Sequence, residues 1–419
     1  MKKLLYITCV LTLSIVSAQK PFINSLDKKS GTPNELVTIS GVGFSTPTVY
    51  FGAGKATSVT VLSSNVLEVL VPSTATYGPV MVVNSNGLSA TSKELFTPAF
   101  DKDNGTNDFE LPTPATGTTT GQLRSYDICM CDFDGDGLLD AAMSNQNTST
   151  TISLIKNTTS TPGTFTFSTP LADHDFQDAT GTGNYTPQFI QCGDLNGDGK
   201  PDLVVTALIP SQTVHIYSNE SSGAGNFSFT KQQRLELPSF NSAQRTTGQV
   251  RIADFDGDGK LDLVVGTVTT GDQSIFIFRN NSTGAPNFVT TPIEVNFAGT
   301  NPGGIIYPGD FDQDGKIDLV IGSSTATGLL TFLRNTSLPS SISFERIGTF
   351  GNSFTRQGLV VADFNLDGLP EVASTTGSSG SIEVLRNSGS FSFTVAGTIA
   401  SSGAFFPIGI DAGDMDGNG

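Results

Sequence analysis

Few residues in this sequence suit catalysis by histidine or the binding of zinc. The 419 residues include two histidines and four cysteines, and neither type occurs at a spacing typical of a zinc site. No nucleophile elbow or phosphate-binding loop is present. Lys and Arg number 22 against 39 Asp and Glu, so the formal net charge is −17. This acidity excludes the basic surface of a nucleic-acid-binding protein and argues against adhesion to anionic lipid.

The cysteines are too few and too uneven for a disulfide framework. Cys9 lies in an N-terminal segment that we expect to be removed, which leaves Cys129, Cys131 and Cys192. A Cys131–Cys192 pair is one alternative, but the sequence favours small buried thiols.

Long apolar runs are missing except at the N-terminus. Lys2 and Lys3 precede the apolar stretch 4–16, which is short for a bilayer crossing, and small residues end it at Ala18. We therefore predict a signal peptide over residues 1–18 and a secreted or cell-surface protein without membrane insertion. A buried strand or an uncleaved anchor is the alternative interpretation.

Glycine and small polar residues are plentiful, and they indicate many short strands joined by turns. The hydrophobic content of 37% is sufficient for ordinary packed cores. We therefore predict an all-β protein, and the length predicts two or more domains.

One acidic pattern occurs six times after residue 130. The starts of successive copies are separated by 62, 60, 56, 53 and 51 residues, a period typical of an array of supersecondary units. We number them loop 1 (132–140), loop 2 (194–202), loop 3 (254–262), loop 4 (310–318), loop 5 (363–371) and loop 6 (414–419). Loop 6 stops where the sequence stops, so we expect a truncated last repeat.

The residues between these loops also repeat. Each complete loop is followed by an apolar run such as 203–205, and in most copies by a strand that ends in Asn and a strand that carries Phe. A further apolar stretch, such as 250–253, leads into the next loop. Four strands per repeat predict the blade of a β-propeller. A flat solenoid is the alternative, but ring closure removes exposed sheet edges and is favoured.

The region before the repeats has a different organisation. Residues 21–97 show alternating short strands separated by glycine turns, with a hairpin signal at Asn86-Gly87. About seven strands in this length predict a small immunoglobulin-like β-sandwich. We expect the sandwich over residues 19–98, a linker over 99–108 and the propeller over 109–419.

The loops have the oxygen donors of a calcium site. Acidic or amide residues occupy positions 1, 3 and 5, glycine occupies position 6, and an acid returns at position 9, with a backbone carbonyl available at position 7. Hard oxygen ligands around a flexible ring suit Ca²⁺ better than Mg²⁺ or Zn²⁺. The predicted ligands are Asp132, Asp134, Asp136, Leu138 and Asp140; Asp194, Asn196, Asp198, Lys200 and Asp202; Asp254, Asp256, Asp258, Lys260 and Asp262; Asp310, Asp312, Asp314, Lys316 and Asp318; Asp363, Asn365, Asp367, Leu369 and Glu371; and Asp414, Asp416 and Asn418.

These loops also account for the acidity of the chain. The five complete loops hold four, three, four, four and three ligand carboxylates, and the sixth holds two, which makes 20 of the 39 acids. A merely solvated acidic surface would not place half of the acids in register. The loops are not EF-hands, because the last acid stands at position 9 and a β-run follows directly. We predict about five complete Ca²⁺ sites with a mainly structural role. Position 2 is always apolar, and we expect it to anchor the loop in its blade.

The loops and the strands around them resemble the FG-GAP or VCBS-type repeat of integrin α subunits and bacterial secreted proteins. The resemblance implies a propeller, usually seven-bladed, with calcium loops on one face. Residues 21–97 resemble the IPT/TIG domain through Pro21-Phe22-Ile23, Ser30-Gly31, residues 37–44, 49–52 and 71–72, and residues 84–87. Such domains act as spacers or binding modules.

Three functions are compatible with the sequence. We favour a calcium-binding adhesion module for an extracellular glycan or protein ligand, because propeller loops are where such ligands dock. A secreted polysaccharide lyase or hydrolase is the second hypothesis, since glycosidase-type carboxylates need no local motif. A structural spacer is the third. His174 lies in a polar loop beside two aspartates, a weak catalytic signal, and we expect His215 to be an exposed strand residue.

Overall fold

The computed structural model describes residues 20–98, 125–145, 152–159, 166–168, 186–399 and 409–412, with short gaps at 53, 73–74, 76–77, 86–87, 210–211, 224, 243, 270, 298–303, 324–327, 366 and 378–379. Every regular element in these residues is a β-strand, which confirms the all-β prediction. The predicted signal peptide, the Asn86-Gly87 turn, the linker and loop 6 lie outside the described residues.

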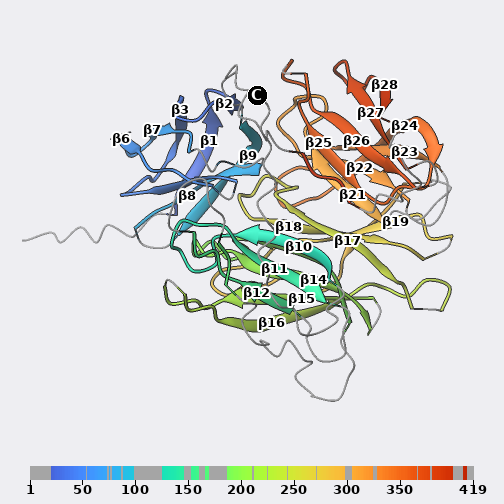
Figure 1. The fold of residues 1–419 in the computed structure, drawn as a ribbon, viewed down its shortest axis with the longest axis horizontal. Helices are drawn as coiled ribbons and strands as arrows, with labels where there is room; N and C mark the ends of the chain where they lie inside the picture. The colour runs from blue at the N-terminus through green and yellow to red at the C-terminus, as the bar shows by residue number, and fades with distance from the viewer. Residues whose placement is uncertain are drawn as a thin grey trace, which may run out of the picture.

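Residues 20–98 form an immunoglobulin-like sandwich of two sheets, here called the Ig-like domain (Figure 1). One sheet has the order β1-β3-β7-β6 and the other β2-β9-β8-β4-β5. The strands are β1 Phe22–Leu26, β2 Ser30–Gly31, β3 Leu36–Val42, β4 Thr48–Phe51, β5 Gly54–Lys55, β6 Val59–Ser63, β7 Val66–Leu70, β8 Gly78–Val83 and β9 Ser89–Pro98. Alternate residues such as Val37 and Ile39 in β3, and Val80 and Val82 in β8, face the core between the sheets.

The repeats form successive antiparallel sheets, one per repeat, as a β-propeller requires. Four sheets have four strands each, and the first has three strands plus a bridge between Asn157 and Phe167. The strands are β10 Ser125–Cys131, β11 Asp140–Asn145 and β12 Ile152–Ile155; β13 Thr186–Gly193, β14 Asp202–Ile209, β15 Thr213–Asn219 and β16 Phe229–Glu236; β17 Thr247–Ala253, β18 Asp262–Thr267, β19 Ser274–Phe278 and β20 Ile293–Asn296; β21 Ile305–Gly309, β22 Asp318–Gly322, β23 Gly328–Asn335 and β24 Phe344–Phe354; and β25 Leu359–Ala362, β26 Glu371–Thr376, β27 Ser381–Asn387 and β28 Phe393–Ile399.

The core of the propeller lies between neighbouring blades. In β14, Leu203 and Val205 pack toward the first blade, whereas Val204 packs toward the third. A strand buried on both faces needs apolar residues at consecutive positions, which explains the unbroken apolar run after each loop. The same arrangement recurs between the third and fourth blades and between the fourth and fifth.

The apolar residue at position 2 of each loop contributes to these interblade cores. Phe133, Leu195, Phe255 and Phe311 are at most 2% exposed, which confirms the predicted anchoring role in loops 1 to 4. Phe133 contacts Phe229 of the next blade edge to face, with ring centroids 5.6 Å apart. Phe364 in loop 5 is 45% exposed, so the prediction is wrong there.

Candidate metal centres

Each complete loop joins the first strand of a blade to its second, so all five lie at the same end of their blades. The acid at position 9 is the first residue of the second strand: Asp140, Asp202, Asp262, Asp318 or Glu371. These five side chains are at most 2% exposed. Each loop is therefore followed by a buried carboxylate at the start of the second strand of its blade.

The position-9 carboxylate uses both oxygens to hold its own loop. In loop 3, Asp262 accepts the backbone N–H of Phe255 at 3.0 Å on one oxygen and that of Asn280 at 2.8 Å on the other. The same pair of contacts is made by Asp140, Asp202, Asp318 and Glu371. Because a carboxylate oxygen has two lone pairs, these bonds leave capacity for a cation.

The position-1 carboxylate closes the turn. In loop 3, Asp254 accepts backbone N–H groups from Gly259 at 2.8 Å and from Asp258 at 3.1 Å. The glycine at position 6 has φ between +83° and +91° in all five loops. Only glycine adopts this left-handed conformation without strain, which confirms the expected sharp turn. The loop side chains are thus positioned by backbone bonds within the loop.

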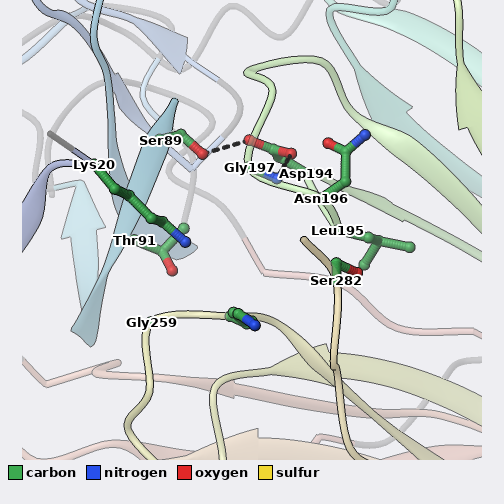
Figure 2. A pocket seen from close by; sticks show the side chains of 10 residues that line it. Lys20, Ser89, Thr91, Asp194, Leu195, Asn196, Gly197, Gly259 and Ser282 are labelled. Carbon is green, nitrogen blue, oxygen red and sulfur yellow. Dashed lines mark hydrogen bonds between the residues drawn. The ribbon is translucent and has the colours of Figure 1, made fainter. Parts of the chain in front are cut away.

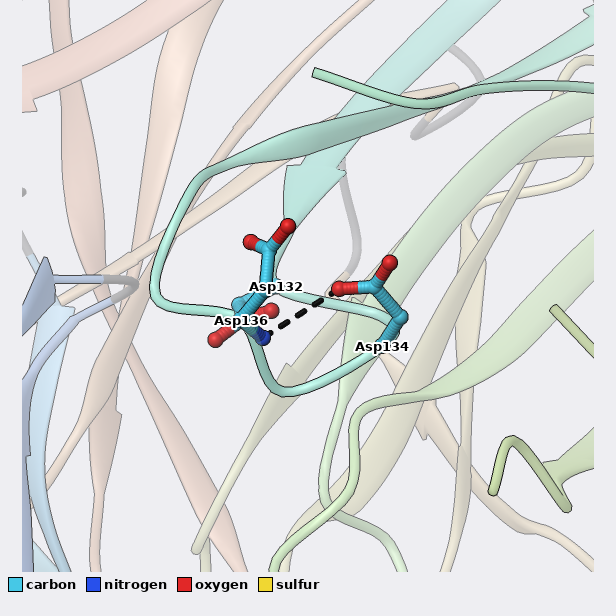
Figure 3. Close-up of side chains that lie close together, drawn as sticks. All are labelled: Asp132, Asp134 and Asp136. Atoms are coloured by element: carbon cyan, nitrogen blue, oxygen red, sulfur yellow. Dashed lines mark hydrogen bonds between the residues drawn. The ribbon is translucent and has the colours of Figure 1, made fainter. Parts of the chain in front are cut away.

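Acid oxygens converge in three of the loops. One oxygen from each of three acids lies within 4.8 Å of the others in loop 1 (Asp132, Asp134, Asp136), loop 3 (Asp254, Asp256, Asp262) and loop 4 (Asp310, Asp312, Asp318). Figure 3 shows the loop 1 group, in which the backbone N–H of Asp136 donates to Asp134 at 3.2 Å. Loops 2 and 5 have Asn at position 3 and form no such group of acids within the described residues. Clusters of this chemistry are consistent with divalent-cation binding.

The carboxyl groups in these clusters resist ionisation. Burial raises the pKa of Asp262 and of Asp318 to about 8 and that of Asp140 to about 6. Burial also raises the pKa of Asp254 and of Asp310 to about 6. Neighbouring carboxylates add to this effect, and the backbone N–H donors oppose it. Positive charge close to these loops would therefore favour the ionised form of their buried carboxyl groups.

Basic side chains supply such charge in four of the five loops. The residue before the strand-ending Asn is basic in these blades, and its head group lies on the outer oxygens of positions 3 and 5. Arg279 contacts Asp256 at 2.5 Å and Asp258 at 3.0 Å. Lys156 and Arg334 make the corresponding contacts to loops 1 and 4. In loop 5, where position 3 is Asn365, Arg386 lies 3.8 Å from Asp367 at position 5. In the second blade Ser218 occupies this position, and no basic side chain of that blade forms an ion pair with a loop 2 carboxylate within the described residues.

The Asn at the end of the third strand of each blade has a structural role that was not predicted from the sequence. Asn280 donates its side-chain N–H groups to the carbonyl of Leu261 in its own loop and to that of Leu195 in loop 2, both at 2.8 Å. Asn219, Asn335 and Asn387 likewise reach the position-2 carbonyl of the preceding loop, at 2.9 to 3.0 Å. These bonds connect each loop to the next around the propeller. Its recurrence at one fixed place in the repeat was the available signal.

The position-7 residues hold the loops in place as well. The backbone N–H of Lys260 donates to Asp258 at 3.0 Å, and the equivalent bond occurs in the other four complete loops. The side chains of Lys200 and Lys316 reach the carbonyls of Ser221 and Ser337 at 2.7 and 2.9 Å. Donation by the position-7 carbonyl to a metal stays a prediction.

Two expectations about single residues are wrong. Cys131 and Cys192 form a disulfide across the first two blades, with Cα atoms 6.6 Å apart, because their innermost strands lie side by side. Of the cysteines in the described residues, Cys129 is the free one, and it is buried. His215 is 1% exposed because β15 is covered on both faces, and its Nε2 lies 3.2 Å from Thr213 Oγ1. His174 lies outside the described residues.

Comparisons with known proteins agree with this geometry. The family model described as FG-GAP-like repeat matches residues 132–205, 194–265 and 363–419, and that of the IPT/TIG domain matches residues 21–98. The chain carries FG-GAP-like repeats and an N-terminal IPT/TIG domain. The recognition made from the loops is thereby confirmed, as is the propeller and sandwich fold.

Curated relatives match over the FG-GAP repeats only in part. Integrin alpha-PS5 of Drosophila melanogaster is 27% identical over 167 residues, which are 36% of this chain and 16% of that protein. Integrin alpha-7 of Homo sapiens is 29% identical over 34% of this chain and 12% of its own length. Phosphatidylinositol-glycan-specific phospholipase D of Homo sapiens is 28% identical over 32% and 18%. The match thus spans less than a fifth of each of these relatives.

Solved structures give looser matches. The BBS1N chain crystallised with ARL6DN and soaked with lead superposes with a TM-score of 0.40 at 16% identity, over 66% of this chain and 68% of that chain. An auxiliary nutrient binding protein from Bacteroides ovatus superposes with a TM-score of 0.29 at 14% identity, over 90% and 86%. Superpositions this loose say nothing about function. Within the described residues, no helix has the length and hydropathy needed to cross a membrane.

Proposed function

We propose that this chain is a secreted, calcium-dependent binding module, in which Ca²⁺ holds the FG-GAP propeller together and an extracellular glycan or protein is the ligand. One observation carries the proposal: five successive blades present acid and amide oxygens in the same register at the same end of the sheet. Repeats of this kind in integrin α chains favour a binding or adhesion role at the cell surface or outside the cell.

The residues at positions 1, 3, 5 and 9 of each loop would hold the cation, with the position-7 carbonyl as a further donor. Their donors are all oxygen, which fits Ca²⁺. Bound Ca²⁺ would neutralise carboxylates that burial disfavours as anions, as the raised pKa values of Asp262 and Asp318 indicate. At about millimolar calcium, a site with a Kd of roughly 10 to 100 µM contributes about 1.4 to 2.7 kcal/mol to folding.

Thermal unfolding of residues 19–419 tests the calcium proposal. The midpoint is measured with millimolar Ca²⁺, with millimolar Mg²⁺ and with a chelator. We expect a clear rise with Ca²⁺ that Mg²⁺ does not reproduce, because Mg²⁺ demands a smaller octahedral site and loses its water reluctantly. An unchanged midpoint with Ca²⁺ would mean that the loops are not calcium sites.

Ligand binding is then tested on glycan and extracellular-protein arrays, with Ca²⁺ and with a chelator. Retention on a defined glycan or protein that the chelator abolishes supports the binding module. Depolymerisation of a polysaccharide by the same preparation would instead favour the secreted enzyme. If the preparation shows no retention and no turnover, the structural spacer would be the surviving interpretation.

A further inference from the structure

The Ig-like domain lies against the end of the propeller that carries the acidic loops. Lys29 of the Ig-like domain lies 4.0 Å from Asp310 in loop 4. Burial and the charge of Asp132 in loop 1 raise the pKa of Tyr50 to about 12. The closest contacts, however, are made to loop 2, the loop for which Ser218 replaces the basic partner present in the other four blades.

The β8–β9 end of the Ig-like domain is seated on loop 2. The Ser89 hydroxyl donates to Asp194 Oδ2 at 2.6 Å, and the Ser89 backbone N–H donates to the Gly197 carbonyl at 2.9 Å. The glycine at position 6 is in close contact too, since a Cβ on Gly199 would lie 2.6 Å from a methyl carbon of Val83. Figure 2 shows Ser89 and Asp194 facing each other across the domain boundary. Every one of these contacts uses an atom whose position depends on the folded conformation of loop 2.

The rest of this boundary is polar. Lys20, Thr91 and Ser89 line a small cleft together with Asp194 and Lys260. The Thr91 hydroxyl is buried and has no hydrogen-bond partner within the described residues. Such a group weakens an interface that excludes water.

No apolar core joins the two domains. In the described residues, the core of the Ig-like domain contains no propeller residue, and the four interblade cores contain none from the Ig-like domain. Docking of the Ig-like domain therefore depends on contacts such as those of Ser89 and Val83, and not on a shared hydrophobic core.

From these contacts we propose that loop 2 is a cation-dependent docking site for the Ig-like domain: a divalent cation that orders loop 2 fixes the domain in place, and Ser89 in turn tightens cation binding at that loop. The proposal rests on the proposed calcium binding and goes beyond it. Without a cation, the three carboxylates of loop 2 repel one another, and Ser218 stands where the other four blades have a basic partner for their loop. With a cation bound, Asp194 and Gly197 are held where Ser89 meets them. Coupling between two binding events is reciprocal, so docking must favour the cation as much as the cation favours docking.

The test measures the distance between the domains by fluorescence energy transfer in the full chain. Dyes are attached at Leu62→Cys and Leu338→Cys, two positions that are 56% and 66% exposed. We expect the energy-transfer efficiency to rise, and the distribution of interdomain distances to become narrower, when Ca²⁺ replaces a chelator. Asp198→Asn at position 5 of loop 2 removes one carboxylate charge from the predicted cation site without touching Ser89, and should greatly reduce this change. The matched variant Asp314→Asn in loop 4 should retain it.

Ser89→Ala tests the reciprocal effect. We expect it to raise the Ca²⁺ concentration needed for docking roughly tenfold to a hundredfold, the equivalent of one hydrogen bond to a charged group. Its control is Ser85→Ala, because the Ser85 hydroxyl bonds only to the carbonyl of Ser45 inside the Ig-like domain. Two outcomes would overturn the docking proposal but not the calcium proposal. In the first, Ca²⁺ raises the unfolding midpoint but leaves energy transfer unchanged. In the second, Asp198→Asn and Asp314→Asn reduce the Ca²⁺-dependent change in energy transfer equally. No effect of Ca²⁺ on either the midpoint or the transfer would overturn the calcium proposal itself.

Discussion

Loops 2 and 3 have the same backbone scheme but different charges around it. In both, the first acid accepts the N–H of the glycine at position 6, and the ninth accepts two further N–H groups. Loop 3 has four acids and is faced by Arg279 of its own blade. Loop 2 has three, has no such cation, and is instead contacted by Ser89 of the Ig-like domain. The loop conformation is thus set by a few carboxylates that accept backbone N–H groups, while the charge balance differs from blade to blade.

The largest effect should come from removing the ninth acid, and it should be equal in the two loops. Asp262→Ala and Asp202→Ala each leave two buried backbone N–H groups without an acceptor. We expect each to lower the free energy of unfolding by about 2 to 5 kcal/mol, with Ca²⁺ or with a chelator. Denaturant unfolding measures this. Asp258→Asn, which keeps an acceptor oxygen at position 5, is the control and should matter only when Ca²⁺ is present. A much smaller loss in Asp202→Ala would show that the two loops do not share one scheme.

A smaller loss is expected when the link between the loops is cut. Asn280→Ala removes two hydrogen bonds, to Leu195 of loop 2 and to Leu261 of loop 3. Because both carbonyls are buried, we expect a loss of about 1 to 3 kcal/mol. The neighbouring Asn281 is exposed, so Asn281→Ala should be nearly neutral in the same denaturant experiment. Equal effects of the two substitutions would refute the linking role of Asn280.

The sequence predicted the blades well because each blade repeats the same requirements. The Asp at position 1, the glycine at position 6 and the apolar run at 203–205 are local, and local patterns determine strands and turns. It gave no role to Asn280, whose partners lie in two different loops and are met only when blades stack. It misjudged His215 for a similar reason, since burial of β15 depends on the next blade.

Contacts between distant parts of the chain could not be predicted from the sequence either, and the contact of Ser89 with loop 2 is one of them. Ser89 and Asp194 are 105 residues apart, and only the packing of the two domains brings them to 2.6 Å. Cys131 and Cys192 are separated by 61 residues, and their pairing depends on two innermost strands being neighbours. In each case the signal is a distance between elements that no local pattern specifies.

The stability of the cation-free protein should fall as pH rises. The ninth acid of loop 3 should cause part of this fall, so a variant that lacks this acid should show a smaller one. Burial raises the pKa of Asp262 and of Asp318 to about 8 in the folded chain, above the value near 4 expected when unfolded. A raised folded pKa gives stability that is full below the unfolded pKa and is lost as pH rises through the folded one. We therefore expect the unfolding midpoint in chelator to fall by several degrees between about pH 5 and pH 8.5.

Two further measurements decide whether the loop carboxyls cause that fall. Asp262→Asn, which does not titrate, should flatten the pH profile in chelator. Saturating Ca²⁺ should flatten it as well, because the cation favours the ionised carboxylates. A profile in chelator that rises toward pH 8.5 would contradict the assignment.

The smallest predicted effect separates the two loops most directly. Arg279 pairs with Asp256 and Asp258, two predicted cation ligands of loop 3, and within the described residues no basic side chain of the second blade pairs with loop 2 in this way. Arg279→Gln should lower stability in chelator by about 0.5 to 1 kcal/mol, since the pair is partly exposed, and leave the Ca²⁺-loaded protein nearly unchanged. The stabilisation by Ca²⁺, measured as the difference between denaturant curves in the two conditions, should increase by the same amount. Arg234→Gln breaks an exposed pair with Glu236 away from any loop and should change neither condition. An equal loss for Arg279→Gln with and without Ca²⁺ would mean that the arginine stays on the carboxylates when the cation binds, and loops 2 and 3 would then differ in net charge rather than in competition for the site.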